Sequence, residues 1–245
     1  RNFGATGESN YCYNYYTPGH WPCGCVATAG AQIMRYHCYP SAEVTPASYS
    51  CATGALTKVV DNMEYYEGVP VTLTMQGGFY DWNSMTLVPA NGCTAAARRA
   101  IGKLTSDVGI SCGMEYFPGG SSSPVYMLTK RFVDRFQYAN AVGATFARGF
   151  YSKDFSYTLE RFKSAVIPNF DAGLPVALGV SGGGYGHAVV GDGYGYSDGN
   201  FYVHVNLGRA DMGGGDAWYM PPDIDEYDTI DSIVYNVYPQ GAAGA

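Results

Sequence analysis

The sequence predicts an α+β fold, with helices in the first half and antiparallel strands in the second. Apolar residues recur at helical spacing through the first half, and apolar runs separated by glycine-rich turns fill the last third. No alternation of strands and helices suggests a doubly wound sheet. We expect one domain over 1–245, made of a strap over 1–22, a helical lobe over about 23–138 and a β lobe over about 139–240.

The expected helices are marked by apolar residues three and four positions apart. The first begins at Cys25 and ends at His37, because Pro40 prevents its continuation. Thr94 is a suitable N-cap for a later helix, and Pro124 suits the first turn of the next. The five expected helices cover Cys25–His37, Ala55–Tyr66, Ala95–Val108, Pro124–Phe136 and Ser156–Ile167.

The expected strands are short apolar or alternating runs bounded by Gly, Asp and Ser. They cover Pro175–Val180, His187–Gly191, Phe201–Asn206, Ala217–Met220 and Ser232–Tyr238. The turns that we expect between them cover Ser181–Gly186, Asp192–Asn200 and Met212–Gly215. The order of these strands indicates an antiparallel sheet.

Composition excludes several classes of function. Hydrophobic residues make up 47% of the 245 residues and charged residues 14%, as in a globular chain. A net charge of −7 without a dense basic run argues against binding to nucleic acid or to an anionic membrane. No apolar run reaches the roughly 18 residues of a membrane helix. Because the chain opens at Arg1 without a leader, we expect a processed, secreted, extracellular protein, and we expect a monomer.

The seven cysteines suggest an oxidising environment. An odd count in a secreted chain predicts three disulfides and one remaining thiol. Sequence cannot fix the pairing, and we expect local links. The pairs are Cys12–Cys23, Cys38–Cys51 and Cys93–Cys112.

Cys25 is the candidate nucleophile because it stands at a predicted helix start, after Gly24. Backbone N–H groups and the helix dipole there favour a thiolate, and the Cys25 N–H can also stabilise an oxyanion. Two alternatives stay open on position alone. Cys25 can be half of a disulfide, or it can join Cys23, His37 and Cys38 in a metal site, although their spacing matches no standard zinc pattern.

A nucleophilic thiol needs a base, and four histidines are candidates. His20 lies in the strap, and His37 lies about three helical turns from Cys25, so neither suits the role. His204 is flanked by valines and is typical of a packed core histidine. His187 follows a glycine-rich loop and opens a strand, which leaves its imidazole accessible. Asn206 ends a later strand and can accept the second imidazole N–H.

Several segments together resemble the streptopain family of cysteine peptidases, a branch of the papain-like superfamily. The order of these segments matches the family from about Tyr13 to Tyr238. The segments are Gly24–Ala29, Ala31–His37, Tyr39-Pro40, Tyr80–Met85, Asp107–Ile110, Gly186–Val189, Asp192-Gly193 and Tyr202–Asn206.

The resemblance implies a papain-like fold in which a helical lobe faces a β lobe. It also implies endopeptidase activity on peptides or proteins, no cofactor and no metal, and secretion as a zymogen with an inhibitory propeptide. The nucleophile of the family falls on Cys25, its histidine on His187 and its asparagine on Asn206.

The sequence departs from the family pattern at three places. No Gln precedes Gln32, so the side-chain donor of the oxyanion hole falls on Ser9 or Asn10. Leu207 and Arg209 stand where the family has tryptophans. These departures keep open a catalytically weak or inactive module that binds peptides or host proteins. A transferase or amidase with the same Cys–His chemistry is a third reading.

Two loops are expected to contact the substrate, one before His187 and one late in the helical lobe. The substrate-binding candidates on them are Tyr185, Gly186 and Ser121.

Overall fold

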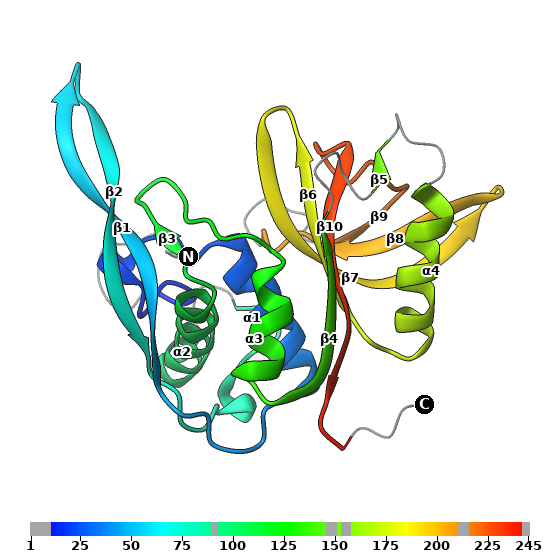
Figure 1. Cartoon of the computed structure of the whole chain (residues 1–245), viewed down its shortest axis with the longest axis horizontal. Helices are drawn as coiled ribbons and strands as arrows, with labels where there is room; N and C mark the ends of the chain where they lie inside the picture. The colour runs from blue at the N-terminus through cyan, green and yellow to red at the C-terminus, as the bar shows by residue number, and fades with distance from the viewer. Residues whose placement is uncertain (1–10, 90–92, 146–150, 153–157, 210–215, 242–245) are drawn as a thin grey trace. The chain divides into compact units, whose positions relative to one another are not determined.

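The structure, a computed structural model, describes residues 11–89, 93–145, 151–152, 158–209 and 216–241 (Figure 1). The chain divides into two compact units, a first unit over Arg1–Pro124 and a second unit over Val125–Ala245. Helix α3 (Met127–Asp134) therefore groups with the sheet, whereas the sequence analysis expected it among the helices of the first half. The single-domain organisation stays a prediction.

The first unit combines two helices with a long β-hairpin (Figure 1). Helix α1 (Cys25–His37) packs against α2 (Ala95–Ser111), and Thr94 caps α2 by accepting a hydrogen bond from the Ala97 N–H at 3.1 Å. Both helices confirm the sequence prediction. The three-stranded sheet has the order β2-β1-β3. Its strands are β1 (Ala47–Val60), β2 (Met63–Met75) and β3 (Glu115–Tyr116), and 3-10 turns lie at Pro18–His20 and Trp82–Ser84.

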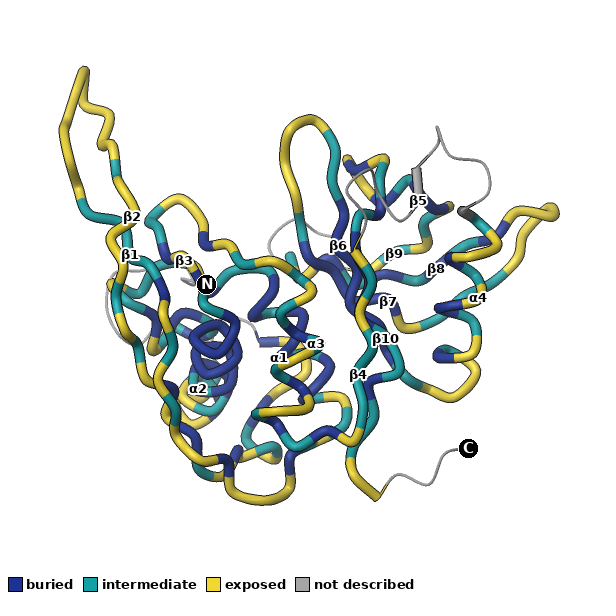
Figure 2. Tube along the Cα trace, in the orientation of Figure 1, coloured by how far each residue is buried: buried dark blue, intermediate teal, exposed yellow. Residues whose placement is uncertain are grey.

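Helix α2 forms the buried centre of the first unit, as its dark blue trace in Figure 2 shows. Its Asp107 carboxylate accepts hydrogen bonds from the N–H groups of Gln76 and Gly77 at 2.6 and 3.0 Å and from the Tyr80 hydroxyl at 2.9 Å. Burial raises the pKa of Asp107, while these three donors favour its ionised form. The Asp107 side chain thus links α2 to the segment that follows β2.

The helix predicted over Ala55–Tyr66 is wrong, because this segment forms the end of β1, a tight turn and the start of β2. Asp61 and Asn62 both have positive φ, at 49° and 62°, and make the two-residue turn. The apolar residues at helical spacing are exposed to solvent. A helix here would therefore gain no stability from a buried apolar face. The exposed residues are Leu56, Val59, Val60 and Met63. Figure 2 shows the end of the hairpin as exposed.

The second unit is built on an antiparallel sheet of the order β4-β10-β6-β7-β8-β9, with β5 paired to β10. Helix α3 packs on β4 and β10, and helix α4 (Thr158–Asp171) contacts β5, β7 and β10. The strands are β4 (Tyr138–Thr145), β5 (Tyr151–Ser152), β6 (Val176–Gly182), β7 (Tyr185–Ser197), β8 (Asn200–Asn206), β9 (Asp216–Tyr219) and β10 (Thr229–Pro239).

The α4 face of this sheet carries the apolar core of the second unit. Phe162 and Val166 of α4 pack in one cluster with Leu178, Val189 and Val203 from neighbouring strands. The inward side chains alternate along β8, as expected for a strand with one face on the core. All five strands predicted in this half are confirmed, and β4 and β5 were missed.

The expected turns of the second unit are shorter than predicted. Over 181–186 only Gly183 and Gly184 turn, with φ of 59° and 85°, and their neighbours pair as strands. Over 192–200 only Asp198 and Gly199 turn, because β7 continues to Ser197. Helix α4 continues past Pro168 to Asp171, beyond its expected end. The expected cap Ser156 and the expected turn Met212–Gly215 lie outside the described residues.

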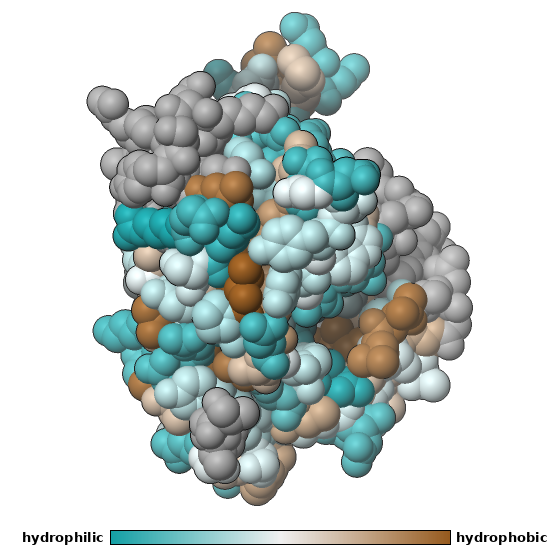
Figure 3. All heavy atoms as spheres, turned by 90° about the vertical axis from the view of Figure 1, so that its right-hand side faces the viewer, coloured by the Kyte–Doolittle hydropathy of each residue, from teal (hydrophilic) through white to brown (hydrophobic). Residues whose placement is uncertain are grey.

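The surface seen in Figure 3 mixes polar and apolar side chains, and its apolar atoms lie in several separate spots. Among the described residues, no helix combines the length and the apolar character needed to span a membrane.

Candidate active site

The candidate nucleophile stands at the first residue of α1. Its N-cap, Gly24, has φ of 89°, a backbone conformation that residues with a side chain rarely adopt. A Cβ atom on Gly24 would also lie 2.7 Å from the Met114 Sδ atom and 2.9 Å from the Ser121 carbonyl oxygen. Cys25 itself is only partly buried. Glycine before the thiol is therefore required both by backbone conformation and by the close approach of neighbouring residues.

The neighbouring thiol Cys23 differs from Cys25 in exposure. Cys23 is buried, and its Sγ atom lies 3.3 Å from the Thr28 hydroxyl, which donates to the Gly24 carbonyl at 3.1 Å. Burial raises the pKa of Cys23 and so favours its neutral thiol. Of these two residues, Cys25 is the more exposed.

None of the seven cysteines is bridged in this structure, so the three predicted disulfides stay predictions. Cys25 is likewise unbridged here. The alternative metal site does not form either, since α1 separates Cys25 from His37 and Cys38 by most of its length. Within the described ranges, no three His, Cys, Asp or Glu side chains are grouped to hold a metal ion.

The candidate base His187 lies near the start of β7, opposite Val180 of β6. Its Nε2 atom lies 2.7 Å from the Leu207 carbonyl oxygen. A carbonyl oxygen can only accept, so Nε2 carries the proton and Nδ1 of the neutral ring is the acceptor. The ring also stacks on Tyr227, with centroids 5.9 Å apart and planes at 24°. Two contacts from distant parts of the sequence thus fix the tautomer and the plane of His187.

The surroundings of His187 favour its neutral form. Burial lowers the pKa of His187 most, the Arg209 charge lowers it further, and the bond to Leu207 opposes both effects. Arg209 donates to Glu226 at 3.0 Å and to the Tyr227 hydroxyl at 2.7 Å. The charged guanidinium is therefore held beside the ring that stacks on the imidazole.

Asn206 is the last residue of β8, and Leu207 follows it directly. Its Oδ1 atom accepts from the Gly208 N–H at 2.8 Å, and its amide N–H donates to Asp216. The sequence analysis expected Asn206 to orient His187, and that role stays a prediction. The bond that the structure places on His187 Nε2 goes to the backbone next to Asn206.

His204 is not a packed core histidine, contrary to the expectation from its flanking valines. Its Nδ1 atom lies 2.6 Å from Asp192 Oδ1, and its ring centroid lies 5.1 Å from that of Trp218. The side chain is 27% exposed. Val203 and Val205 point into the core, so alternation along β8 places His204 on the other face.

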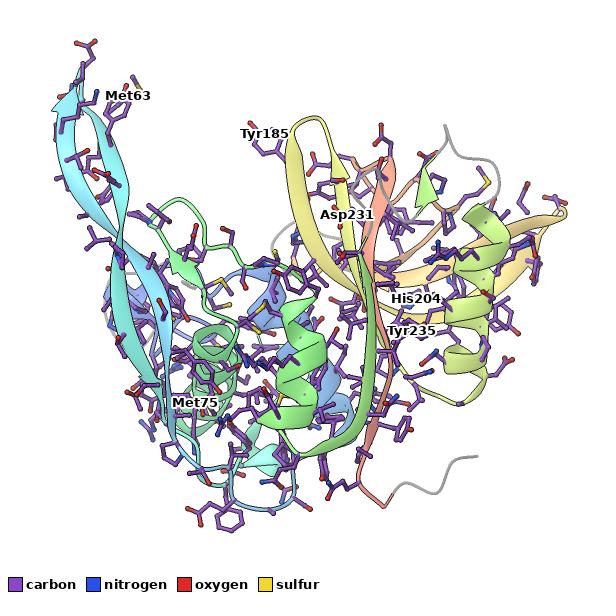
Figure 4. All side chains as sticks on the ribbon, in the orientation of Figure 1. Met63, Met75, Tyr185, His204, Asp231 and Tyr235 are labelled. Carbon is purple, nitrogen blue, oxygen red and sulfur yellow. The ribbon has the colours of Figure 1, made fainter. Side chains whose placement is uncertain are left out.

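The remaining predicted site residues lie in different surroundings. Tyr185 projects from the start of β7 and is 78% exposed (Figure 4), and Gly186 beside it is exposed. Ser121 is buried, and its hydroxyl accepts from the Phe117 N–H at 3.3 Å. Ser9 and Asn10, the candidates for the oxyanion hole, lie outside the described residues.

Comparison with known proteins places the chain in a family. The profile of the Peptidase C10 family matches residues 8–219. The chain belongs to this family. The C10 chain is 29% identical over 189 residues to streptopain of Streptococcus pyogenes, covering 77% of this chain and 43% of that protein. It is 25% identical over 214 residues to the thiol protease/hemagglutinin PrtT of Porphyromonas gingivalis, covering 80% of this chain and 22% of that protein.

Solved structures show the fold of the C10 chain. Active wild-type interpain A, a cysteine protease of Prevotella intermedia, superposes with a TM-score of 0.66 at 25% identity, covering 87% of this chain and 82% of its own. A mutant prointerpain A fragment superposes with a TM-score of 0.64 at 24% identity, covering 89% and 64%. These neighbours confirm the papain-like α+β fold. The C10 chain spans less than half the length of the curated relatives that it matches.

Sequence reasoning missed three partners of His187 in the C10 chain. The Leu207 carbonyl belongs to the backbone, so no residue type signals it. Tyr227 and Arg209 lie 40 and 22 positions after His187, and only the return of the chain beside β7 brings them to the imidazole. The replacement of a family tryptophan by Arg209 marked that position without indicating its role.

Proposed function

We propose that the chain is a cysteine endopeptidase in which Cys25 is the nucleophile and His187 the general base. The observation that carries the proposal is the position of Cys25, which is partly exposed at the start of α1. The residue before it, Gly24, has a backbone conformation that favours glycine. Membership of a cysteine peptidase family gives the reaction class, hydrolysis of peptide bonds.

In the proposed reaction, the Cys25 thiolate attacks the carbonyl carbon of a substrate peptide. The first N–H groups of α1 stabilise the oxyanion, because they have no partner within the helix. His187 takes the thiol proton on Nδ1 and delivers it to the leaving amine. Water then hydrolyses the thioester, with His187 as its base.

The Leu207 carbonyl keeps the acceptor nitrogen of His187 available throughout this cycle. Because Nε2 donates to it, Nδ1 is the nitrogen that exchanges the proton. The same bond stabilises the imidazolium form, since a backbone acceptor favours the charged donor. We propose that Asn206 supports this arrangement indirectly, through its bond to the Gly208 N–H just after Leu207.

We further propose that the protein is secreted as an inactive precursor with an inhibitory propeptide and acts as a monomer. The existence of a prointerpain A form among the structural neighbours supports the precursor. Tyr185 and Gly186 are exposed on the strand that carries His187, which supports a role in contacting substrate.

Cys25→Ala tests the proposal, with Cys38→Ala as the matched control because Cys38 is exposed at the other end of α1. We expect Cys25→Ala to abolish hydrolysis of a casein substrate, by a factor of about 10⁴ or more, and Cys38→Ala to retain it. Unchanged hydrolysis in Cys25→Ala would refute the nucleophile.

A second measurement separates a peptidase from a module that only binds peptides. We expect iodoacetamide at pH 6 to alkylate Cys25 faster than Cys38, and His187→Ala to remove this advantage. Equal, slow alkylation of both thiols would favour the binding module.

A further inference from the structure

The β1–β2 hairpin exposes apolar side chains along its free end. Leu56, Val59 and Met63 are 51%, 57% and 58% exposed. The free end extends away from the helices of the first unit, as Figures 1 and 2 show. Apolar side chains gathered on one exposed element are typical of a surface that binds another molecule.

The pairing of β1 with β2 divides the side chains of the hairpin between two faces. Leu56 pairs with Tyr66, and Val59 pairs with Glu64. Tyr66 and Glu64 are two positions apart on β2, so they and their partners share one face. The Tyr66 hydroxyl donates to Glu64 at 2.7 Å, which agrees with this assignment. These four residues are called the hairpin face below.

The hairpin face begins beside the segment that leads to Cys25. The Trp21 and Tyr66 ring centroids lie 6.1 Å apart, with the ring planes at 77°. Both side chains are only partly buried. Trp21 precedes Cys25 by four residues, and four residues span at most about 14 Å. A polypeptide bound at Cys25 therefore reaches the hairpin face within about ten extended residues.

A second contact joins the hairpin to the turn before the candidate nucleophile. Gly54 and Gly68 pair directly, and Cβ atoms on them would lie 2.8 and 3.3 Å from the Phe117 ring. The Phe117 N–H donates to the Ser121 hydroxyl at 3.3 Å. The Ser121 carbonyl oxygen lies 2.9 Å from the position of a Cβ atom on Gly24. The middle of the hairpin is thus packed on the loop that adjoins this turn.

The charge of the free end indicates which kind of partner it can bind. Over 56–67 the hairpin carries one lysine, Lys58, and three carboxylates, Asp61, Glu64 and Glu67. The whole chain has a net charge of −7. A second copy of the chain and an anionic membrane would both bring like charge to this surface, which opposes binding. A basic polypeptide brings the opposite charge.

We propose that the hairpin face is an exosite, a surface that binds a basic and apolar segment of a protein substrate away from the bond that Cys25 cleaves. Leu56, Val59 and Tyr66 contact the apolar side chains of that segment. Glu64 pairs with one of its lysines or arginines. The inference rests on the proposed peptidase function. Binding at the exosite strengthens the capture of a long chain and leaves a short peptide unaffected.

The test compares two unfolded proteins of similar length and opposite charge. Lysozyme is the basic substrate and α-lactalbumin the acidic one, both reduced and blocked with iodoacetamide. An eight-residue peptide around a cleavage site found in lysozyme is the short substrate. We expect added salt to lower kcat/KM on lysozyme more than on the octapeptide or on α-lactalbumin, because salt screens the attraction to the exosite.

Matched double variants then compare the two faces of the hairpin. Val59→Ser with Glu64→Gln changes the hairpin face, and Val69→Ser with Glu67→Gln makes the same changes on the opposite face. We expect the first pair to lower kcat/KM on lysozyme about tenfold, mainly through KM, and to leave octapeptide cleavage within about twofold. The second pair should retain both activities. Equal losses in the two double variants, or an equal loss on the octapeptide, would overturn the exosite.

A binding measurement separates failure of the exosite from failure of the proposed function. Fluorescently labelled, unfolded lysozyme is titrated with the full chain carrying Cys25→Ala, and its anisotropy is followed. Adding the Val59 and Glu64 changes should weaken binding about tenfold, and adding the Val69 changes with Glu67→Gln should not. Equal binding by both would refute the exosite. Binding that depends on the hairpin face in a chain that cleaves no substrate would refute the peptidase and retain the binding surface.

Discussion

The two candidate catalytic residues are held in different ways. Cys25 is placed mainly by its own segment, since α1 begins there and Gly24 makes the turn before it. His187 is placed by Leu207 and Tyr227, which follow it by 20 and 40 positions. The difference shows that a nucleophile at a helix start is specified locally, whereas the plane and tautomer of a histidine on a strand are specified by tertiary contacts.

The two regions also differ in how much change they tolerate. Around Cys25, the backbone of Ser121 and the Met114 side chain leave no space for another methyl group at Gly24. Around His187, the supports are a hydrogen bond, a ring stack and a nearby charge, each of which can be weakened alone. We therefore expect abrupt effects in the first region and graded effects in the second.

Among the residues that support Cys25 and His187, the largest effect is expected from Gly24→Ala. The added Cβ atom would clash with Met114 and the Ser121 carbonyl and would strain the left-handed backbone. A displacement of about 1 Å at the nucleophile costs about 100-fold in rate, so we expect at least that loss in kcat/KM. Gly193→Ala is the control, since its Cβ atom would meet nothing nearer than 3.8 Å. Full activity in Gly24→Ala would show that local geometry does not hold Cys25.

A smaller effect is expected from Tyr227→Ala, which removes the ring stacked on His187. We expect kcat/KM to fall about tenfold, because the imidazole loses the ring that fixes its plane. Tyr227→Phe keeps the ring, loses the hydroxyl that accepts from Arg209, and should stay within about threefold. Assays below the Tm of each variant separate this effect from unfolding. Equal losses in both variants would assign the effect to the hydroxyl.

Asn206→Ala tests whether the backbone or the amide orients His187. Because the Leu207 carbonyl keeps its bond to Nε2, we expect a loss in kcat/KM of less than about tenfold. His187→Ala should lose about 1000-fold or more in the same assay. If both variants lost activity equally, the Asn206 side chain would be the orienting group.

The smallest effect is expected from Arg209→Gln, which removes a positive charge near His187. The pKa of His187 should rise, because Asp225 and Glu226 remain and favour the imidazolium. An NMR titration of His187 in a Cys25→Ala background measures the change, and Lys163→Gln is a charge-matched control on α4. A fall in this pKa would contradict the proposed role of Arg209.

The lowered pKa of His187 also has a consequence for stability. The folded state favours the neutral imidazole, so the stability from this group is present above the pKa of the unfolded chain. It is lost as pH falls through that value toward the folded pKa. The free energy of unfolding, measured with urea over this pH range, should depend less on pH in Arg209→Gln than in the unchanged protein.

The sequence was sufficient where local signals agreed with the tertiary structure. Pro40, Thr94 and the apolar spacing located α1 and α2, and alternation located the strands from β6 onward. It failed over Ala55–Tyr66, where apolar residues at helical spacing belong to a solvent-exposed hairpin. There the Asp61-Asn62 turn and the pairing with β2 decided the conformation.

By itself, the sequence determined that Cys25 begins a helix and that His187 opens a strand, because both depend on neighbouring residues. Only the tertiary structure decided that the Leu207 carbonyl and Tyr227 hold the imidazole. A backbone acceptor has no sequence signature, and the ring that stacks on a histidine depends on which distant segments pack together. Packing between distant segments is the information that spacing along the chain does not contain.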